Sequence, residues 1–185
     1  KDESIEDSMK EIFRFSKYYS NLVSGEFEDK EISKVVKDIN TLKMDVVYPF
    51  FLDVLDDHHR RIISHDQVIE IMRMTESYVF RRSICEIPTN SLNNTFANLA
   101  KEIDENNYLE SLKAAFIIKK TYSRFPDNDE FRREFILKNV YNFRNVKYLL
   151  EKLENYNRKE VVNVQEYTVE HIMPQHLTEE WKTML

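Results

Sequence analysis

Apolar residues recur three or four positions apart along most of the chain, which is the spacing that places them on one face of an α-helix. The first such stretch carries Ile5, Met9, Ile12 and Phe13. Comparable stretches follow up to residue 156 and are separated by polar or proline-containing segments. The pattern predicts helices over residues 5–23, 29–42, 46–57, 64–85, 91–105, 109–124, 129–138 and 143–156.

Two of these predicted helices begin at residues that favour a helix start. Ser64 can accept a hydrogen bond from the first turn of the helix that follows it, and Gln67 can reach back to the chain before it. Asp127 with Glu130 offers a similar start for a later helix. The stretch 46–57 is apolar nearly all round, so we expect it to be the central buried helix.

The spacing of apolar residues changes after Lys159. Residues 161–172 are rich in β-branched side chains and alternate in part, which predicts one strand or two short ones. A further helix is expected to open at Thr178. The predicted fold is therefore mainly α, a multi-helix bundle of about eight helices with a short β element near the C-terminus. The predicted domains are residues 1–159, helical, and residues 160–185.

Composition narrows the class of protein. Gly25 is the single glycine, and tight β-turns depend on residues that tolerate positive φ, so neither a β-sandwich nor a β-barrel is expected. Cys85 is the single cysteine, which excludes an internal disulfide and fits a reducing cytoplasm. No apolar run approaches the roughly 20 residues that span a bilayer, and the first residues do not predict a signal peptide. Because the chain starts at Lys1 without Met and stops at Leu185 inside a predicted helix, both ends are expected to be cut from a longer protein.

Charge is distributed unevenly along the chain. The net charge is −6, which argues against a strongly basic nucleic-acid module. Residues 113–158, however, hold 11 Lys and Arg against 6 Asp and Glu. Such a block could face a phosphate backbone, although an ordinary solvated helix face has the same composition more often.

Candidate chemistry is confined to one short segment. The chain contains no glycine-rich phosphate loop, no cysteine pair for zinc and no nucleophile elbow. Near the C-terminus, Glu170 and His171 stand side by side in the predicted strand and are followed by Pro174 and Gln175. Adjacent strand residues point to opposite faces, so an acid next to a histidine is by itself only a weak indication of a site.

A family resemblance strengthens that indication. The segment 167–175, YTVEHIMPQ, resembles the first strand of the His-metal finger (HNH-type) nuclease domain of the GmrSD-like, modification-dependent restriction endonucleases. The segments 76–85, ESYVFRRSIC, and 88–93, PTNSLN, resemble the helical region that precedes this nuclease domain in the same family. The two matches occur in the family's order, and the resemblance covers about residues 60–185.

The resemblance implies specific roles for the residues of the motif. His171 would be the general base that deprotonates the water attacking a phosphodiester, a task that suits an imidazole at neutral pH. Glu170 would be a ligand of Mg²⁺ or Mn²⁺, cations that prefer oxygen donors. Pro174 and Gln175 would shape the turn out of the strand. A finger of this type also needs a later helix that brings further metal ligands, so the 185 residues alone are expected to be inactive and to hold no metal.

The resemblance also implies partners. The full protein would bind double-stranded DNA, and Arg81, Arg82, Lys119 and Lys120 are candidate DNA contacts. The family's N-terminal NTP-hydrolysing domain and the remainder of the finger would lie elsewhere in the longer protein, and assembly into a homo-oligomer is compatible with the sequence.

Three functions remain open from the sequence. In the first, the chain is part of a nuclease that hydrolyses modified, phage-derived DNA. In the second, its helices are a coupling or binding module that links an NTPase domain to the nuclease and carries no chemistry of its own. In the third, the helices are a scaffold in which Glu170 and His171 are only structural. The first is favoured for the full protein and the second for the 185-residue chain.

Overall fold

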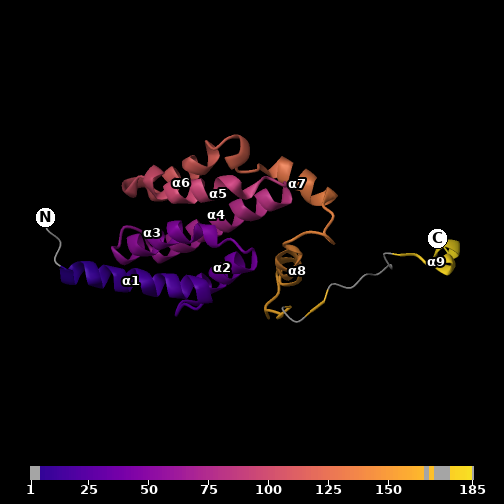
Figure 1. Ribbon diagram of the computed structural model, residues 1–185, viewed down its shortest axis with the longest axis horizontal. Coiled ribbons are helices and arrows are strands. Elements are labelled where there is room, and N and C mark those ends of the chain that lie inside the picture. Colours follow the sequence, from indigo (N-terminus) through magenta and orange to yellow (C-terminus); the bar gives the residue numbers. More distant parts are fainter. Residues whose placement is uncertain (1–4, 165–166, 169–175, 185) are drawn as a thin grey trace. The chain divides into compact units, whose positions relative to one another are not determined.

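The computed structural model describes residues 5–164, 167–168 and 176–184 and divides the chain into two compact units (Figure 1). The first unit is Lys1–Tyr148 and the second is Leu149–Leu185. The domain boundary predicted near Lys159 stays a prediction.

The described residues form nine α-helices joined by loops and single 3-10 turns, which confirms the predicted mainly α fold. None of the helices in the described part of the chain is long and apolar enough to cross a membrane. The α-helices are α1 Ile5–Ser24, α2 Lys30–Thr41, α3 Tyr48–His59, α4 His65–Ile84, α5 Leu92–Leu99, α6 Tyr108–Ile117, α7 Asn128–Leu137, α8 Val146–Glu154 and α9 Glu179–Met184. The 3-10 turns are η1 Asp45–Val47, η2 Thr89–Ser91, η3 Ala100–Glu102, η4 Glu105–Asn107 and η5 Thr121–Ser123.

Local capping chemistry sets several helix starts. The predicted capping box is present at α4, where the Ser64 hydroxyl accepts from the backbone N–H of Gln67 and the Gln67 side chain accepts from the backbone N–H of Ser64. At α7 the Asp127 carboxylate accepts from the backbone N–H of Glu130 at 2.8 Å, as predicted. Each bond satisfies a backbone donor that the first turn of a helix leaves without a partner.

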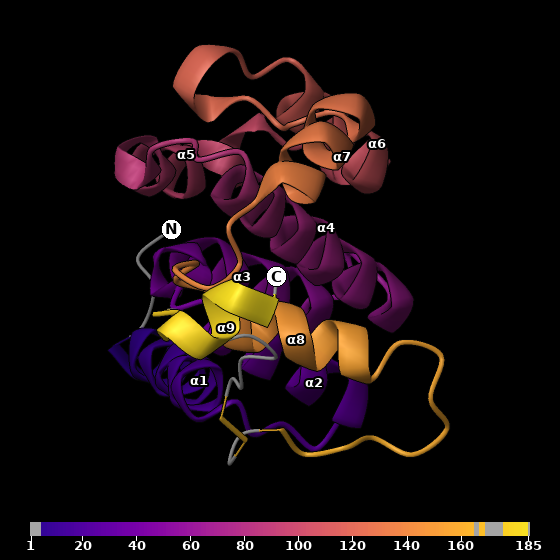
Figure 2. The same cartoon turned by 90° about the vertical axis from the view of Figure 1, so that its right-hand side faces the viewer.

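The core of the first unit lies around α3 and α4. Phe50, Phe51 and Val54 of α3 are fully buried, which confirms the expectation of a central apolar helix. Helix α4 contacts α2 and α3 on one side and α7 on the other (Figure 2). Tyr78 of α4 packs against Phe116 of α6 with a ring separation of 4.8 Å. Helix α4 therefore joins α2 and α3 to α6 within this core.

Two predicted helices are shorter than expected. The stretch 91–105 forms α5 followed by single 3-10 turns, and the stretch 109–124 ends as α6 at Ile117. Thr121 adopts a φ of 52°, a left-handed conformation that a continuous α-helix does not contain. Apolar spacing alone predicts where a helical face lies and does not locate such backbone breaks.

The predicted β element is not confirmed. Residues 161–164 and 167–168, the described part of the predicted strand, are not in a strand. Instead, Asn155 holds this segment in an irregular conformation: its side chain accepts from the backbone N–H of Val162 at 2.7 Å and donates to the Val162 carbonyl at 3.1 Å. A side chain that satisfies both backbone groups of one residue replaces the ladder that a strand would need. The rest of the predicted strand lies outside the described residues.

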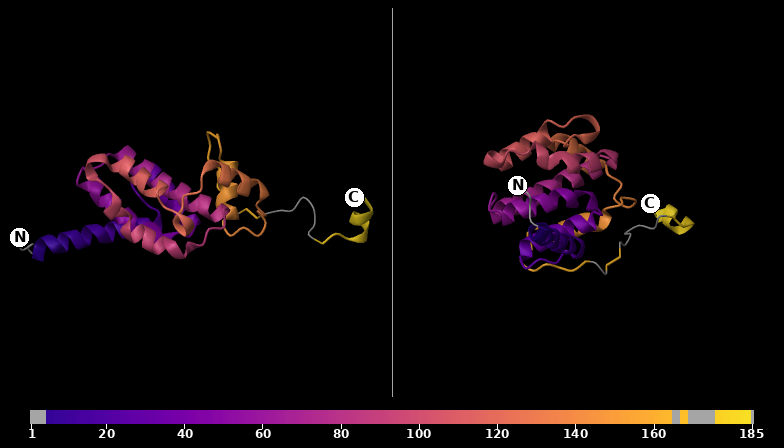
Figure 3. Two further views of the ribbon diagram at one scale, coloured as in Figure 1. Left: turned by 90° about the horizontal axis from the view of Figure 1, so that it is seen from above. Right: turned by 60° about the vertical axis from the view of Figure 1, so that its left-hand side comes forward.

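The apolar face of α1 is only partly used by the core. Ile5, Met9, Ile12 and Phe13 are each more than 60% exposed, whereas Leu22 at the other end of the helix is fully buried. Figure 3 shows the first turns of α1 extending past the other helices of its unit. The periodicity therefore predicted this helix correctly but not the exposure of its first half.

A buried polar network joins α2, α4 and the first turn of α8. Arg73 donates to Asp38 and to Glu76, each at 2.7 Å, and the Tyr148 hydroxyl donates to Glu76 at 2.6 Å. Glu76 is 5% exposed, so its carboxylate depends on these donors for the solvation that water would otherwise supply. Burial, together with the adjacent Glu76 carboxylate, raises the pKa of Tyr148 well above its usual range.

Removing the Tyr148 hydroxyl should therefore destabilise the protein. We expect Tyr148→Phe to lower the free energy of unfolding by about 1–3 kcal/mol, because the buried Glu76 carboxylate loses a donor. Urea denaturation followed by circular dichroism measures the change. Tyr19→Phe is the matched control, since Tyr19 is 53% exposed, and it should change stability by less than about 0.5 kcal/mol. Equal effects of the two substitutions would contradict the role given to the network.

Candidate nuclease motif and candidate nucleic-acid contacts

The four predicted motif residues Glu170, His171, Pro174 and Gln175 lie outside the described residues. Their predicted roles therefore stay predictions. On the C-terminal side of the motif the predicted helix start at Thr178 is present as α9. The backbone N–H of Lys182 donates to the carbonyl of Thr178 at 3.0 Å.

Arg82, a candidate DNA contact, is buried inside the first unit with 2% of its surface exposed. Its guanidinium donates to the carbonyls of Tyr122, Arg124 and Pro88 at 2.7, 3.3 and 2.8 Å, and to the Ser91 hydroxyl at 3.2 Å. Burial lowers the pKa of this guanidinium. The side chain therefore holds the segment around η5 against the end of α4. Because it is buried, it is not available to contact DNA.

Arg81, its neighbour in α4, is half-buried and is also engaged with the protein. It donates to the carbonyl of Pro126 at 3.2 Å, and its guanidinium carbon lies 5.0 Å from the centre of the Phe131 ring. This cation–π packing fixes α7 beside α4. Part of the guanidinium remains at the surface, so a phosphate contact would have to compete with these interactions.

Lys119 and Lys120 follow α6 and differ in their surroundings. The Lys119 ammonium pairs with Glu102 at 3.0 Å, and its side chain is 11% exposed. Lys120 is exposed to solvent. Of the four candidate DNA contacts, Lys120 is therefore the one whose charge is most available to a phosphate backbone.

The described residues offer little conventional catalytic chemistry. No group of three or more His, Cys, Asp or Glu in the described part of the chain is arranged to hold a metal ion. Burial raises the pKa of the Cys85 thiol to about 11, so almost none of it is the nucleophilic thiolate at neutral pH. The candidate chemistry stays with the motif at residues 170 and 171.

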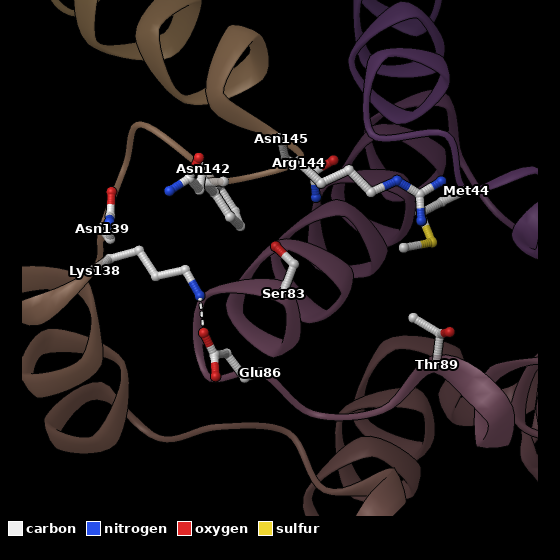
Figure 4. Close-up of a pocket in the computed structure, with 10 residues that line it drawn as sticks. Met44, Ser83, Glu86, Thr89, Lys138, Asn139, Asn142, Arg144 and Asn145 are labelled. Atoms are coloured by element: carbon white, nitrogen blue, oxygen red, sulfur yellow. Dashed lines mark hydrogen bonds and ion pairs between the residues drawn. The ribbon is translucent and has the colours of Figure 1, made fainter. Parts of the chain in front are cut away.

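The structure also shows a polar pocket that sequence reasoning missed. A pocket of about 360 Å³ is formed by the loop between α7 and α8 and by the end of α4 (Figure 4). Asn139, Asn142 and Asn145 recur at intervals of three along this loop, within the basic block 113–158. That repeat was the available signal, but asparagine is common in loops, and only the structure shows that these side chains line one cavity.

Comparison with known proteins bears on the same part of the chain. Residues 125–184 match the family model described as GmrSD restriction endonucleases, C-terminal domain. The matched segment includes α7, α8, the polar pocket's loop and the whole motif at 167–175. Neither the search of curated proteins nor that of solved structures found a match. Residues 125–184 of this chain are therefore similar to the C-terminal domain of the GmrSD restriction endonucleases, which supports the family resemblance for that part of the chain.

Proposed function

We propose that this chain is part of a DNA endonuclease that hydrolyses phosphodiester bonds in modified, phage-derived DNA. The observation that carries the proposal is the family match over residues 125–184, because this segment contains the predicted general base and the predicted metal ligand. The exposed Lys120 and the basic block 113–158 support a DNA partner, since cations along a surface favour a phosphate backbone.

In this proposal the two motif residues have different chemical roles. His171 takes a proton from the attacking water through a neutral imidazole, which has an ordinary pKa of about 6.5. Glu170 supplies carboxylate oxygen, the donor type that Mg²⁺ and Mn²⁺ prefer. The bound cation supplies positive charge that stabilises the developing charge on the phosphate and the leaving oxygen. Pro174 and Gln175 end the segment and set the direction of the chain after it.

The helices before the motif have a separate proposed role. Residues 5–164 contain the packed core of α3 and α4 and the interactions of Arg82, none of which resembles a catalytic centre. We assign them the coupling of other domains to the nuclease, the second function that the sequence left open. The 185 residues alone are then expected not to cleave DNA, because a finger of this type needs a later helix with further ligands.

A cleavage assay tests the proposal. The full-length protein is incubated with modified phage DNA and with an unmodified copy of the same sequence, in Mg²⁺, in Mn²⁺ and in EDTA. We expect cleavage of the modified DNA only, and only with a divalent cation. Cleavage in EDTA, or equal cleavage of both DNAs, would contradict the proposal. Robust cleavage by the 185-residue chain would contradict the coupling role.

A further inference from the structure

The polar pocket in the first unit is lined by charged and amide side chains that can bind a ligand. Its wall combines the loop from Lys138 to Asn145 with the last turn of α4 and the residues that follow it. Its volume of about 360 Å³ lies within the range of small-ligand sites. The lining residues are mostly polar or charged: Met44, Ser83, Glu86, Thr89, Lys138, Asn139, Asn142, Phe143, Arg144 and Asn145.

Asn145 is the first feature that indicates a ligand. Only 6% of this residue is exposed, and it lines the pocket. Among the described residues the buried side-chain atom left without a hydrogen-bond partner is Arg82 Nε, so the Asn145 amide, which bonds to no other described residue, is not sealed from solvent. A polar group from a bound molecule would satisfy this amide.

The charges around the pocket are the second feature. Lys138 donates to the Glu86 carboxylate at 2.7 Å, with the lysine side chain 11% exposed and the glutamate side chain 81% exposed. Figure 4 shows this pair at one side of the pocket, with Arg144 at another. Arg144 is exposed, so its guanidinium is accessible from solvent. The lining therefore carries two cations and one carboxylate, an excess of positive charge.

Glu86 behaves as an internal anion that occupies Lys138. The ammonium of Lys138 holds the pKa of Glu86 below its ordinary value, so the carboxylate stays ionised at neutral pH. Because the Glu86 carboxylate lies in solvent, water screens its attraction to the largely buried Lys138 side chain. An incoming anion with more charge and more acceptor oxygens can therefore replace Glu86 on Lys138.

We propose that this pocket binds a phosphate group, held by the Asn145 amide, the Arg144 guanidinium and the Lys138 ammonium after Glu86 has been displaced. A phosphate offers only acceptor oxygens, and each of these three side chains is a donor. The phosphate can belong to the backbone of DNA or to a free nucleotide. That it belongs to substrate DNA rests on the proposed function, whereas phosphate binding itself needs only the residues of the pocket.

Binding experiments on the 185-residue chain test the proposal with three probes: inorganic phosphate, ATP and a 20-base-pair duplex of ordinary DNA. Arg144→Gln is expected to weaken the binding of each probe that occupies the pocket by about tenfold, as loss of a charge-assisted hydrogen bond does. Lys147→Gln is the matched control, since Lys147 is exposed, lies outside the pocket and carries the same charge. It should leave phosphate and ATP binding unchanged within about twofold.

Glu86→Gln is expected to have the opposite effect on phosphate binding. Removing the competing carboxylate should tighten binding by about threefold, whereas Glu28→Gln, an exposed acid elsewhere, should have no such effect. Asn145→Asp keeps the size of the side chain and places a negative charge where the phosphate binds, so binding should be lost. Thermal denaturation establishes whether the Asn145 variant is folded, and the exposed Arg144 provides a test that does not depend on it.

The outcomes separate the two sources of phosphate. If Arg144→Gln and Glu86→Gln change the affinity for the duplex, the pocket contacts the DNA backbone. If they change only the affinities for inorganic phosphate and ATP, the pocket binds a free nucleotide. If all three probes bind the Arg144→Gln and Glu86→Gln variants as they bind the unchanged chain, the proposal is wrong. A protein that cleaves no DNA but still binds phosphate in this pattern would refute the proposed function and leave this inference standing.

Discussion

Replacing Arg82 by methionine is expected to lower the free energy of unfolding by about 3–5 kcal/mol, because several acceptors lose hydrogen bonds to a charged donor, each worth roughly 1.5–3 kcal/mol. Three backbone carbonyls and the Ser91 hydroxyl would lose a bond from the guanidinium, although the Tyr122 carbonyl keeps the Ser91 hydroxyl as a donor. Methionine fills a similar length of space but donates no hydrogen bond. The segment around Tyr122 would then lose the bonds from Arg82 and keep the bond from the Tyr78 hydroxyl of α4 to the Ser123 carbonyl.

Urea denaturation of the variant measures this loss. For a chain of this size, a change of about 4 kcal/mol corresponds to a fall of roughly 10 °C in melting temperature. Arg81→Met is the matched control: Arg81 precedes Arg82 in α4 and makes one hydrogen bond, to the Pro126 carbonyl. We expect it to cost less than about 2 kcal/mol. If both variants lose the same stability, the account of Arg82 as the anchor of this region is incorrect.

Replacing His171 by alanine is expected to reduce the rate of DNA cleavage by the full-length protein by at least about 100-fold. Proton transfer by a positioned side chain contributes about 10²–10⁴ to the rate of a hydrolysis, and alanine cannot accept a proton. The variant should bind DNA as the unchanged protein does, since the loss concerns the chemical step. Single-turnover cleavage and a gel-shift titration measure the two quantities separately.

His176→Ala is the matched control for this substitution. His176 lies five positions after His171, and it carries no role in the proposed chemistry. Its replacement should change the rate by no more than about twofold. A His176→Ala variant as inactive as His171→Ala, or a fully active His171→Ala variant, would show that the base has been assigned to the wrong residue.

The elements that sequence reasoning predicted well are those governed by neighbouring residues. The start of α4 follows from a capping box between Ser64 and Gln67, and the start of α7 from Asp127. Both depend on side chains within three positions of the backbone groups they satisfy. The buried face of α3 likewise follows from its own apolar residues, because a helix that is apolar nearly all round has to lie inside the protein.

The features that escaped prediction depend on residues far apart in the sequence. Arg82 and the carbonyl of Tyr122 are 40 positions apart, and Glu76 and Tyr148 are 72 positions apart. Nothing in the local pattern distinguishes a buried arginine from one that faces DNA. The polar pocket is similar, because Glu86 and Lys138 meet only after α4 and α7 have packed together.

The motif at Glu170 and His171 illustrates a different limit. Its interpretation came from a resemblance to a family and not from the spacing of its residues, which predicted at most one side chain on each face of a strand. The family match over residues 125–184 supports that resemblance for the last third of the chain. The helical stretch 76–93, for which the same resemblance was an expectation from the sequence, lies outside the matched segment and contributes Arg82 and the buried Glu76 to the core.

The pH dependence of DNA cleavage by the full-length protein tests the central proposal most directly. A neutral imidazole is required at His171, so the single-turnover rate should rise with pH as the imidazole loses its proton and level off above that transition. In His171→Ala the residual rate should lose this transition. A profile that keeps the same transition in His171→Ala would contradict the assignment of His171 as the general base of a nuclease.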